Sequence, residues 1–137
     1  MAGIYLGLSS CCTKMYWLGF DDLNEIQLIN FNAADADSIA FEIFERNSNF
    51  ANRIDSSFTS AHVRDAGNTE LIIFMPEHIN LDHDYKITLN STGQVYKLTE
   101  IANKKEECNC PSDKYNVLDS YYVNGERHNS TSLTITK

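Results

Sequence analysis

The stretch SIAFEIFE, residues 38–45, carries the pattern that decides the fold. Ile39, Phe41 and Ile43 fall on one side of an extended chain, and Glu42 falls on the other. Successive side chains of a β-strand point to opposite faces of the sheet. The alternation therefore predicts a strand with one face in a core and one face in water.

Other segments repeat or vary this pattern. YKITLN, from Tyr85, and SLTITK, from Ser132, alternate in the same way. ELIIFM, from Glu70, is apolar throughout, which is typical of a strand covered on both faces. Pro76 follows it and has no N–H for a strand ladder, so we expect that strand to end there.

The stretch DDLNEIQLINF, residues 21–31, fits two kinds of element. Leu23, Ile26 and Ile29 have helical spacing, whereas Ile26 and Leu28 alternate as in a strand. The segment is short and its neighbours are strands, so we interpret it as a strand.

Turn sequences separate these runs. DAGN (residues 65–68) and NSTGQ (residues 90–94) each lie between two strand-like segments and predict hairpins. Asn124-Gly125 follows SYYV and suits a type I′ turn, because both central residues of that turn need a positive φ.

Together these segments predict an all-β fold of about eight strands. We expect a two-sheet antiparallel β-sandwich of Ig-like or related Greek-key type, with a barrel as the alternative. The Cys–Trp–Cys pattern of antibody domains is missing, since the only tryptophan, Trp17, lies near the N-terminus.

Composition and net charge argue against some classes of function. The chain has 137 residues, of which 42% are hydrophobic and 22% charged, as expected for one globular domain. Its net charge is −8, and the only adjacent lysines, Lys104 and Lys105, are followed by two glutamates. We therefore expect no nucleic-acid partner. No apolar run is long enough to predict a membrane-spanning helix.

The N-terminus contains a short targeting-like motif. An apolar run over residues 2–8 leads into Leu8-Ser9-Ser10-Cys11, which resembles a bacterial lipobox. The resemblance implies cleavage before Cys11 and a diacylglyceryl group on its sulfur. Residues 1–3 carry no Lys or Arg, which departs from the usual signal peptide. The alternative is that residues 4–6 begin a first strand.

The motif sets the expected domain organisation. Residues 1–10 would be the remnant of a signal peptide, residues 11–19 a tether, and residues 20–137 a single β-sandwich domain. The stretch over residues 75–101, the cysteine-rich loop after it and the segment LDSYYVNG are together similar to small exported lipoproteins of the Bacteroidetes. This resemblance implies a bacterial cell-envelope location, in the outer membrane or periplasm, and names no catalytic residue.

Three cysteines remain if Cys11 is lipidated. Cys108 and Cys110 have C-x-C spacing, which is too short for the usual zinc turn, so we favour either a disulfide between Cys12 and one of these two or free thiols. Zinc bound by all four thiolates is the alternative. We expect no cofactor.

One acidic segment offers candidate polar groups. Asp82, His83 and Asp84 are consecutive, and carboxylates with an imidazole suggest a metal site or an acid–base pair. Alternation lets only Asp82 and Asp84 share a ligand, so they are weak metal candidates. The simpler interpretation is a polar loop before a strand.

Tyrosines near the C-terminus form a candidate binding surface. Tyr115, Tyr121 and Tyr122 lie close together in sequence, and exposed tyrosines suit contact with another protein or a glycan. Tyr121 and Tyr122 are adjacent, so one of them is expected in the core.

These observations favour a non-catalytic binding or accessory module, attached to a membrane through a lipid anchor. Two alternatives stay open. One is a secreted metal-dependent or hydrolytic enzyme that uses Asp82, His83 and Asp84. The other is a structural subunit of a surface assembly that pairs through an exposed edge strand.

Overall fold

The structure is a computed structural model that describes residues 23–65, 69–107 and 114–137. The expected segments 1–10 and 11–19 lie outside the described residues. The described part consists of strands and one short 3-10 helix, in the order β1 (Glu25–Ile29), η2 (Ala33–Ala36), β2 (Ile39–Glu45), β3 (Arg53–Thr59), β4 (His62–Asp65), β5 (Thr69–Phe74), β6 (His83–Leu89), β7 (Gln94–Glu107), β8 (Lys114–Val123), β9 (Glu126–Asn129) and β10 (Leu133–Thr136).

The strands form two sheets, which confirms the predicted all-β sandwich. A four-stranded sheet has the order β10-β1-β5-β4, and a six-stranded sheet has the order β3-β2-β6-β7-β8-β9. The described residues hold more strands than the eight or so expected, because β3 is mostly polar and β9 is entirely polar, so neither shows an apolar alternation.

One pairing differs from the antiparallel sandwich that the sequence predicts. β1 and β10 pair in parallel, with Ile26 opposite Leu133 and Leu28 opposite Ile135. No turn links the first and last described strands, so no local signal in the sequence reveals that they meet or in which direction.

The core lies between the sheets and is built by the predicted alternation. Ile39, Phe41 and Ile43 of β2 are buried, and β6 and β10 repeat the pattern. β5 is buried on both faces at Leu71, Ile72 and Ile73. The core cluster also includes Ile26, Leu28, Tyr85, Ile87, Leu89, Leu98, Ile101, Leu118, Tyr121, Leu133 and Ile135.

The predicted hairpins are confirmed. β4 pairs with β5, β6 with β7, and β8 with β9, each pair antiparallel. Asn124 and Gly125 between β8 and β9 have φ values of 51° and 83°, as a type I′ turn requires. The segment that could have been a helix forms β1 instead and stops at Asn30, whose φ is 66°.

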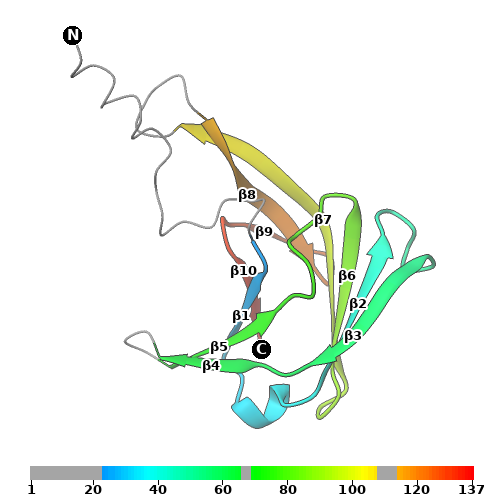
Figure 1. Ribbon diagram of the computed structural model, residues 1–137, viewed down its shortest axis with the longest axis vertical. Helices are drawn as coiled ribbons and strands as arrows, with labels where there is room; N and C mark the ends of the chain where they lie inside the picture. The colour runs from blue at the N-terminus through cyan, green and yellow to red at the C-terminus, as the bar shows by residue number, and fades with distance from the viewer. Residues whose placement is uncertain (1–22, 66–68, 108–113) are drawn as a thin grey trace.

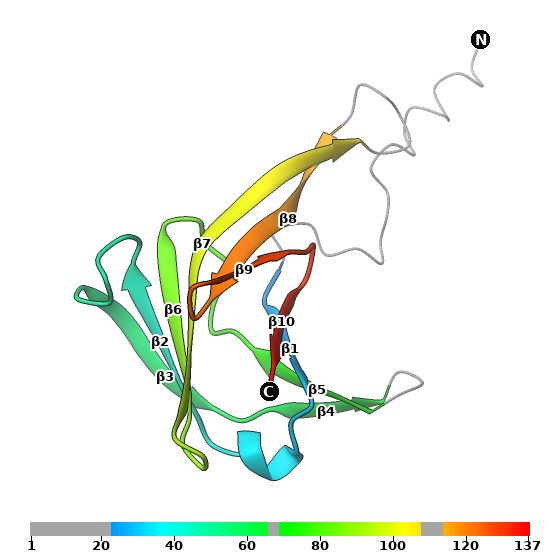
Figure 2. The same ribbon diagram turned by 180° about the vertical axis from the view of Figure 1, so that it is seen from behind.

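The chain passes between the two sheets at both of their ends. The six-stranded sheet is strongly curved, so that β3 continues into β4 at one corner and β9 into β10 at the other (Figure 1, Figure 2). The first corner is fixed to η2, because the Ala61 N–H donates a 2.8 Å hydrogen bond to the Ala36 carbonyl. The ten described strands thus form a flattened ring, in which the β3–β4 and β9–β10 connections link the two sheets.

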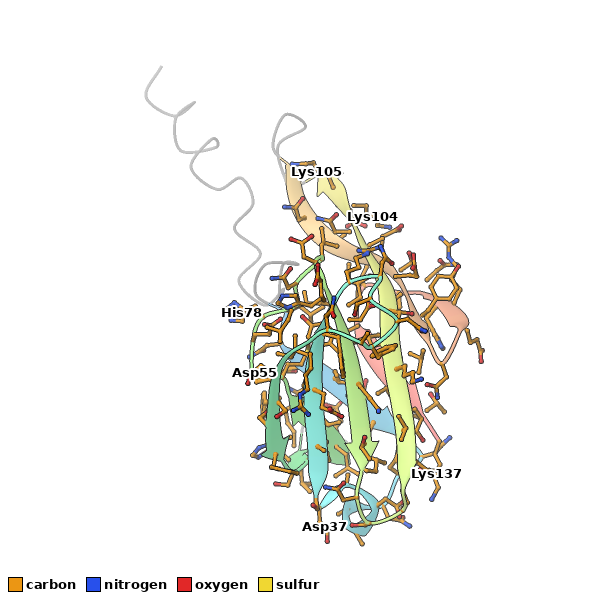
Figure 3. All side chains as sticks on the ribbon, turned by 90° about the vertical axis from the view of Figure 1, so that its right-hand side faces the viewer. Asp37, Asp55, His78, Lys104, Lys105 and Lys137 are labelled. Atoms are coloured by element: carbon orange, nitrogen blue, oxygen red, sulfur yellow. The ribbon has the colours of Figure 1, made fainter. Side chains whose placement is uncertain are left out.

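The β7–β8 hairpin extends beyond the rest of the sandwich (Figure 1). Lys104 and Lys105 lie near its far end, opposite Asp37 and Lys137 at the other pole of the molecule (Figure 3). Among the described residues, no helix has the length and apolar character needed to cross a membrane.

Candidate functional site

The three residues of the segment Asp82-His83-Asp84 lie in three different environments. Asp82 lies in the turn before β6 and is exposed, whereas His83 and Asp84 are the first two residues of β6. His83 contacts Glu77, and Asp84 is buried beside Phe44, its partner on β2. Within the described residues, no three His, Cys, Asp or Glu side chains gather closely enough to hold a metal ion.

His83 belongs to a hydrogen-bonded cluster that the sequence did not reveal. Its Nδ1 lies 2.7 Å from Glu77 Oε2, and the Tyr85 hydroxyl donates to the same oxygen at 2.7 Å. Burial raises the pKa of Tyr85 far above its ordinary value, and the bond to Glu77 raises it further. Tyr85 therefore stays a neutral donor, and an ionised Glu77 requires the proton of His83 on Nδ1.

This cluster fixes the connection between β5 and β6. The Asn80 N–H donates to the Tyr85 hydroxyl at 3.0 Å, and the Ile79 N–H donates to the Leu23 carbonyl at 2.7 Å. Tyr85 thus ties the β5–β6 connection to the sheet through a core side chain. Glu77 carries no sequence signal because only the path of this connection brings it to His83.

Asp84 is the one buried charged residue among the described residues, with 4% of its surface exposed. Its Oδ2 accepts a hydrogen bond from the Asn47 N–H at 3.2 Å, and its Oδ1 has no hydrogen-bond partner in the described part of the chain. Burial raises the pKa of Asp84 above its ordinary value, and nearby Glu100 adds to this. The Asn47 bond and the charge of Arg46 oppose the rise.

The connection between β2 and β3, residues 46–52, is here called the β2–β3 loop. Asn47, Asn49 and Phe50 in it have φ values of 61°, 54° and 59°. Asparagine tolerates this left-handed region, but a bulky aromatic residue there is strained. Phe50 is held by Phe44, with ring centroids 5.1 Å apart, and by Lys97, whose Nζ lies 5.1 Å from the ring centre.

The predicted tyrosine surface needs correction at Tyr121. Tyr121 is fully buried, its hydroxyl donates to the Ser132 carbonyl at 3.0 Å, and it accepts a 3.0 Å bond from the Thr134 N–H. It therefore joins β8 to the edge of β10 at one corner of the sandwich and cannot meet a partner. Tyr122 is half-buried, and the side chain of Tyr115 lies outside the described residues.

A row of side chains crosses the outer face of the six-stranded sheet. Phe58 pairs with Ala40, Ala40 with Thr88, and Thr88 with Val95, and we call these four residues the outer row. Phe58 is 82% exposed, and Val95 is exposed at the other end of the row. The sequence did not single out Phe58, because its neighbours on β3 are Ser, Asp and Thr.

The edge of β3 carries features that oppose strand addition. The ladder with β2 is interrupted by a bulge at Ile43/Phe44, and Asp55 lies on the core-facing side, opposite Ile43. Asp55 Oδ1 accepts a 2.8 Å bond from the Ser56 N–H. Bulges and inward-pointing charges make an edge a poor template for another strand. Assembly through an exposed edge strand stays a prediction, and this geometry does not favour β3 as that edge.

The four cysteines lie outside the described residues. Lipidation of Cys11, and a disulfide among Cys12, Cys108 and Cys110, therefore stay predictions. No family model, no curated protein and no solved structure matches the chain.

Proposed function

We propose that the chain is a lipid-anchored, non-catalytic binding or accessory module of a bacterial cell envelope. The observation that carries this proposal is Leu8-Ser9-Ser10-Cys11 after an apolar run, ahead of a folded β-sandwich. Small residues before a cysteine suit cleavage, and the thiol suits acylation. Several acyl chains on one residue would give stable attachment, whereas a single chain binds a membrane only marginally.

The polar groups of the folded part support a structural role over a catalytic one. Glu77, His83 and Tyr85 bind one another and hold the β5–β6 connection in place. Asp84 is buried beneath the β2–β3 loop, where a substrate cannot reach its carboxylate without movement of the loop. An acid–base catalyst must be within reach of the substrate proton that it transfers.

The outer row supports a binding role. Phe58 presents an almost fully exposed aromatic ring on an open sheet face, with Val95 at the far end of the row and small side chains between them. An exposed aromatic ring suits contact with the apolar face of a sugar or with an apolar side chain of another protein. A protein or a glycan at the envelope is therefore the class of partner that we propose.

Mass spectrometry of the chain produced in a bacterium that processes lipoproteins tests the anchor. We expect loss of residues 1–10, added acyl mass on Cys11 and recovery of the protein in the membrane fraction. Cys11→Ser should abolish the modification and release the protein from the membrane, whereas the matched variant Cys12→Ser should keep both. An unmodified Cys11 in the membrane fraction, or acylation that survives Cys11→Ser, would rule the anchor out.

A further inference from the structure

The β2–β3 loop covers a buried carboxylate. It folds over Asp84 and Phe44 on the outer face of the six-stranded sheet, and its Asn47 N–H donates to Asp84 Oδ2 at 3.2 Å. Arg46 begins the loop, and its backbone N–H donates to the Asp82 carbonyl at 2.9 Å. The loop is thus fastened at its start to the same β6 terminus that carries Asp84.

We propose that the β2–β3 loop is a pH-sensitive latch, closed over Asp84 when that carboxyl is protonated and loosened when it is ionised. The inference concerns the folded sandwich alone and does not depend on the proposed lipid anchor.

The first support is the incomplete solvation of Asp84. An ionised carboxylate has two oxygens that accept hydrogen bonds, but only Oδ2 has a donor among the described residues. A buried charge without full hydrogen bonding is costly, and opening the loop would return Oδ1 to water. Protonation removes the charge and with it the main reason to open.

The second support is that the nearest cation is engaged elsewhere. Arg46 Nη1 donates to the carbonyls of Leu81 and Ile101 at 2.8 Å and 2.9 Å, and its Nη2 lies 3.8 Å from Glu100 Oε2. Arg46 attracts the Asp84 charge, but Glu100 on β7 opposes that attraction. The net effect of the surroundings, dominated by burial, is a raised pKa of Asp84.

The third support is the strain in the loop itself. Asn47, Asn49 and Phe50 all hold positive φ values, and Phe50 does so with a bulky side chain. This conformation is strained for a bulky residue, and strained backbone is common in segments that switch. Contacts of Phe50 with Phe44 and Lys97 hold the closed form, so that a small change at Asp84 can shift the balance.

The direction of the pH effect follows from the raised pKa of Asp84. In the open loop the carboxyl is in water and has a pKa near its ordinary value of 3.8. Below that value both forms are protonated. As the pH rises, the open form ionises first, so the open population grows with pH, by at most about tenfold per pH unit, until the closed form ionises too.

Other charged side chains lie on the elements around Asp84. Arg46 at the start of the loop and Lys97 beside it are cationic side chains, and Lys86 lies two residues further along β6, on the same face as Asp84. Glu45, which pairs with His83 beside Asp84, and Glu100 on β7 are the other carboxylates near the site. Glu100→Gln should therefore move the midpoint of the transition and leave the transition in place.

Amide hydrogen exchange of the full chain, from about pH 4 to about pH 8 and corrected for intrinsic exchange rates, tests the latch. We expect the opening of Asn47, Ser48 and Ala51 amides to increase several-fold with pH. Asp84→Asn should hold these amides at the low-pH level of opening at every pH. The matched variant Asp82→Asn, an exposed carboxyl two residues away, should keep the wild-type dependence.

Two outcomes would overturn the proposal: loop opening that does not change with pH in the wild type, or the same pH dependence in Asp84→Asn. If Asp84→Asn does not fold, the Asn47 amide resonance of the wild-type protein provides the test. We expect it to shift with a midpoint above 3.8, because its N–H contacts the titrating carboxyl. A resonance that does not move, or that moves with a midpoint at or below 3.8, would also overturn the proposal.

Discussion

β2 and β3 are neighbouring strands of equal length, yet they have opposite characters. Each has seven residues, and the two pair in antiparallel register. Phe41 of β2 is fully buried, whereas Phe58 of β3 is 82% exposed. On the core-facing side of β3 stand Asp55, Ser57 and Thr59, opposite the buried Ile43, Phe41 and Ile39.

Position in the sheet explains the difference. β2 lies between β3 and β6, so its apolar side chains are covered by the opposite sheet and by neighbours on both sides. β3 is an edge, where a polar core-facing side and a bulge make the strand a poor template for another strand. β2 and β3 share one hydrogen-bond ladder, yet β2 contributes to the buried core and β3 to the exposed surface.

The largest expected effect on stability comes from replacing a phenylalanine by alanine on β2, and the same replacement on β3 is the comparison. Phe41→Ala should lower the free energy of unfolding by about 3–5 kcal/mol, because it removes buried contacts and leaves a cavity. Phe58→Ala should change it by no more than about 0.5 kcal/mol, as an exposed position does. Urea denaturation of the two variants measures both values.

Similar losses for the two variants would contradict the assignment of Phe58 to the surface. They would show that another part of the chain covers β3 in solution.

A smaller effect is expected on β6, the other neighbour of β2. Tyr85→Phe should destabilise the protein by about 1–3 kcal/mol, because it leaves the Asn80 N–H without its acceptor and Glu77 Oε2 with His83 as its one remaining partner. Tyr96→Phe is the matched control. Its hydroxyl donates only to Gln94 at 3.2 Å on a half-exposed site, so its loss should cost less than about 0.5 kcal/mol. Thermal unfolding of the two variants compares them, and equal shifts would argue against a structural role for the Tyr85 cluster.

The smallest effect on stability is expected at Asp55, the carboxylate on the core-facing side of the β3 edge. Asp55→Val should change the free energy of unfolding by about 0.5 kcal/mol or less, since the site is exposed. It should nevertheless promote self-association, because it removes an inward charge and frees the Ser56 N–H. Sedimentation at increasing protein concentration measures this. Asp82→Val, in a turn away from the sheet edge, should self-associate no more than the wild type does.

Much of the fold was predictable because its signals are local. The alternation in residues 38–45 gave β2 its buried face, and Asn124-Gly125 gave the tight turn between β8 and β9. The candidate site was less predictable. Asp82, His83 and Asp84 are adjacent in sequence, but a turn and the alternation of β6 separate them, and Glu77 joins His83 only through the path of the β5–β6 connection.

The sequence by itself determined most of the strands, their buried faces and their hairpin turns, since each depends on residues within a few positions of one another. Tertiary structure alone decided that β1 pairs with β10 and that the Tyr121 hydroxyl binds the backbone of β10. It also decided that Asp84 is buried while Phe58 is exposed. The physical reason is that burial and partnership depend on which elements cover a side chain, and those elements come from distant parts of the chain.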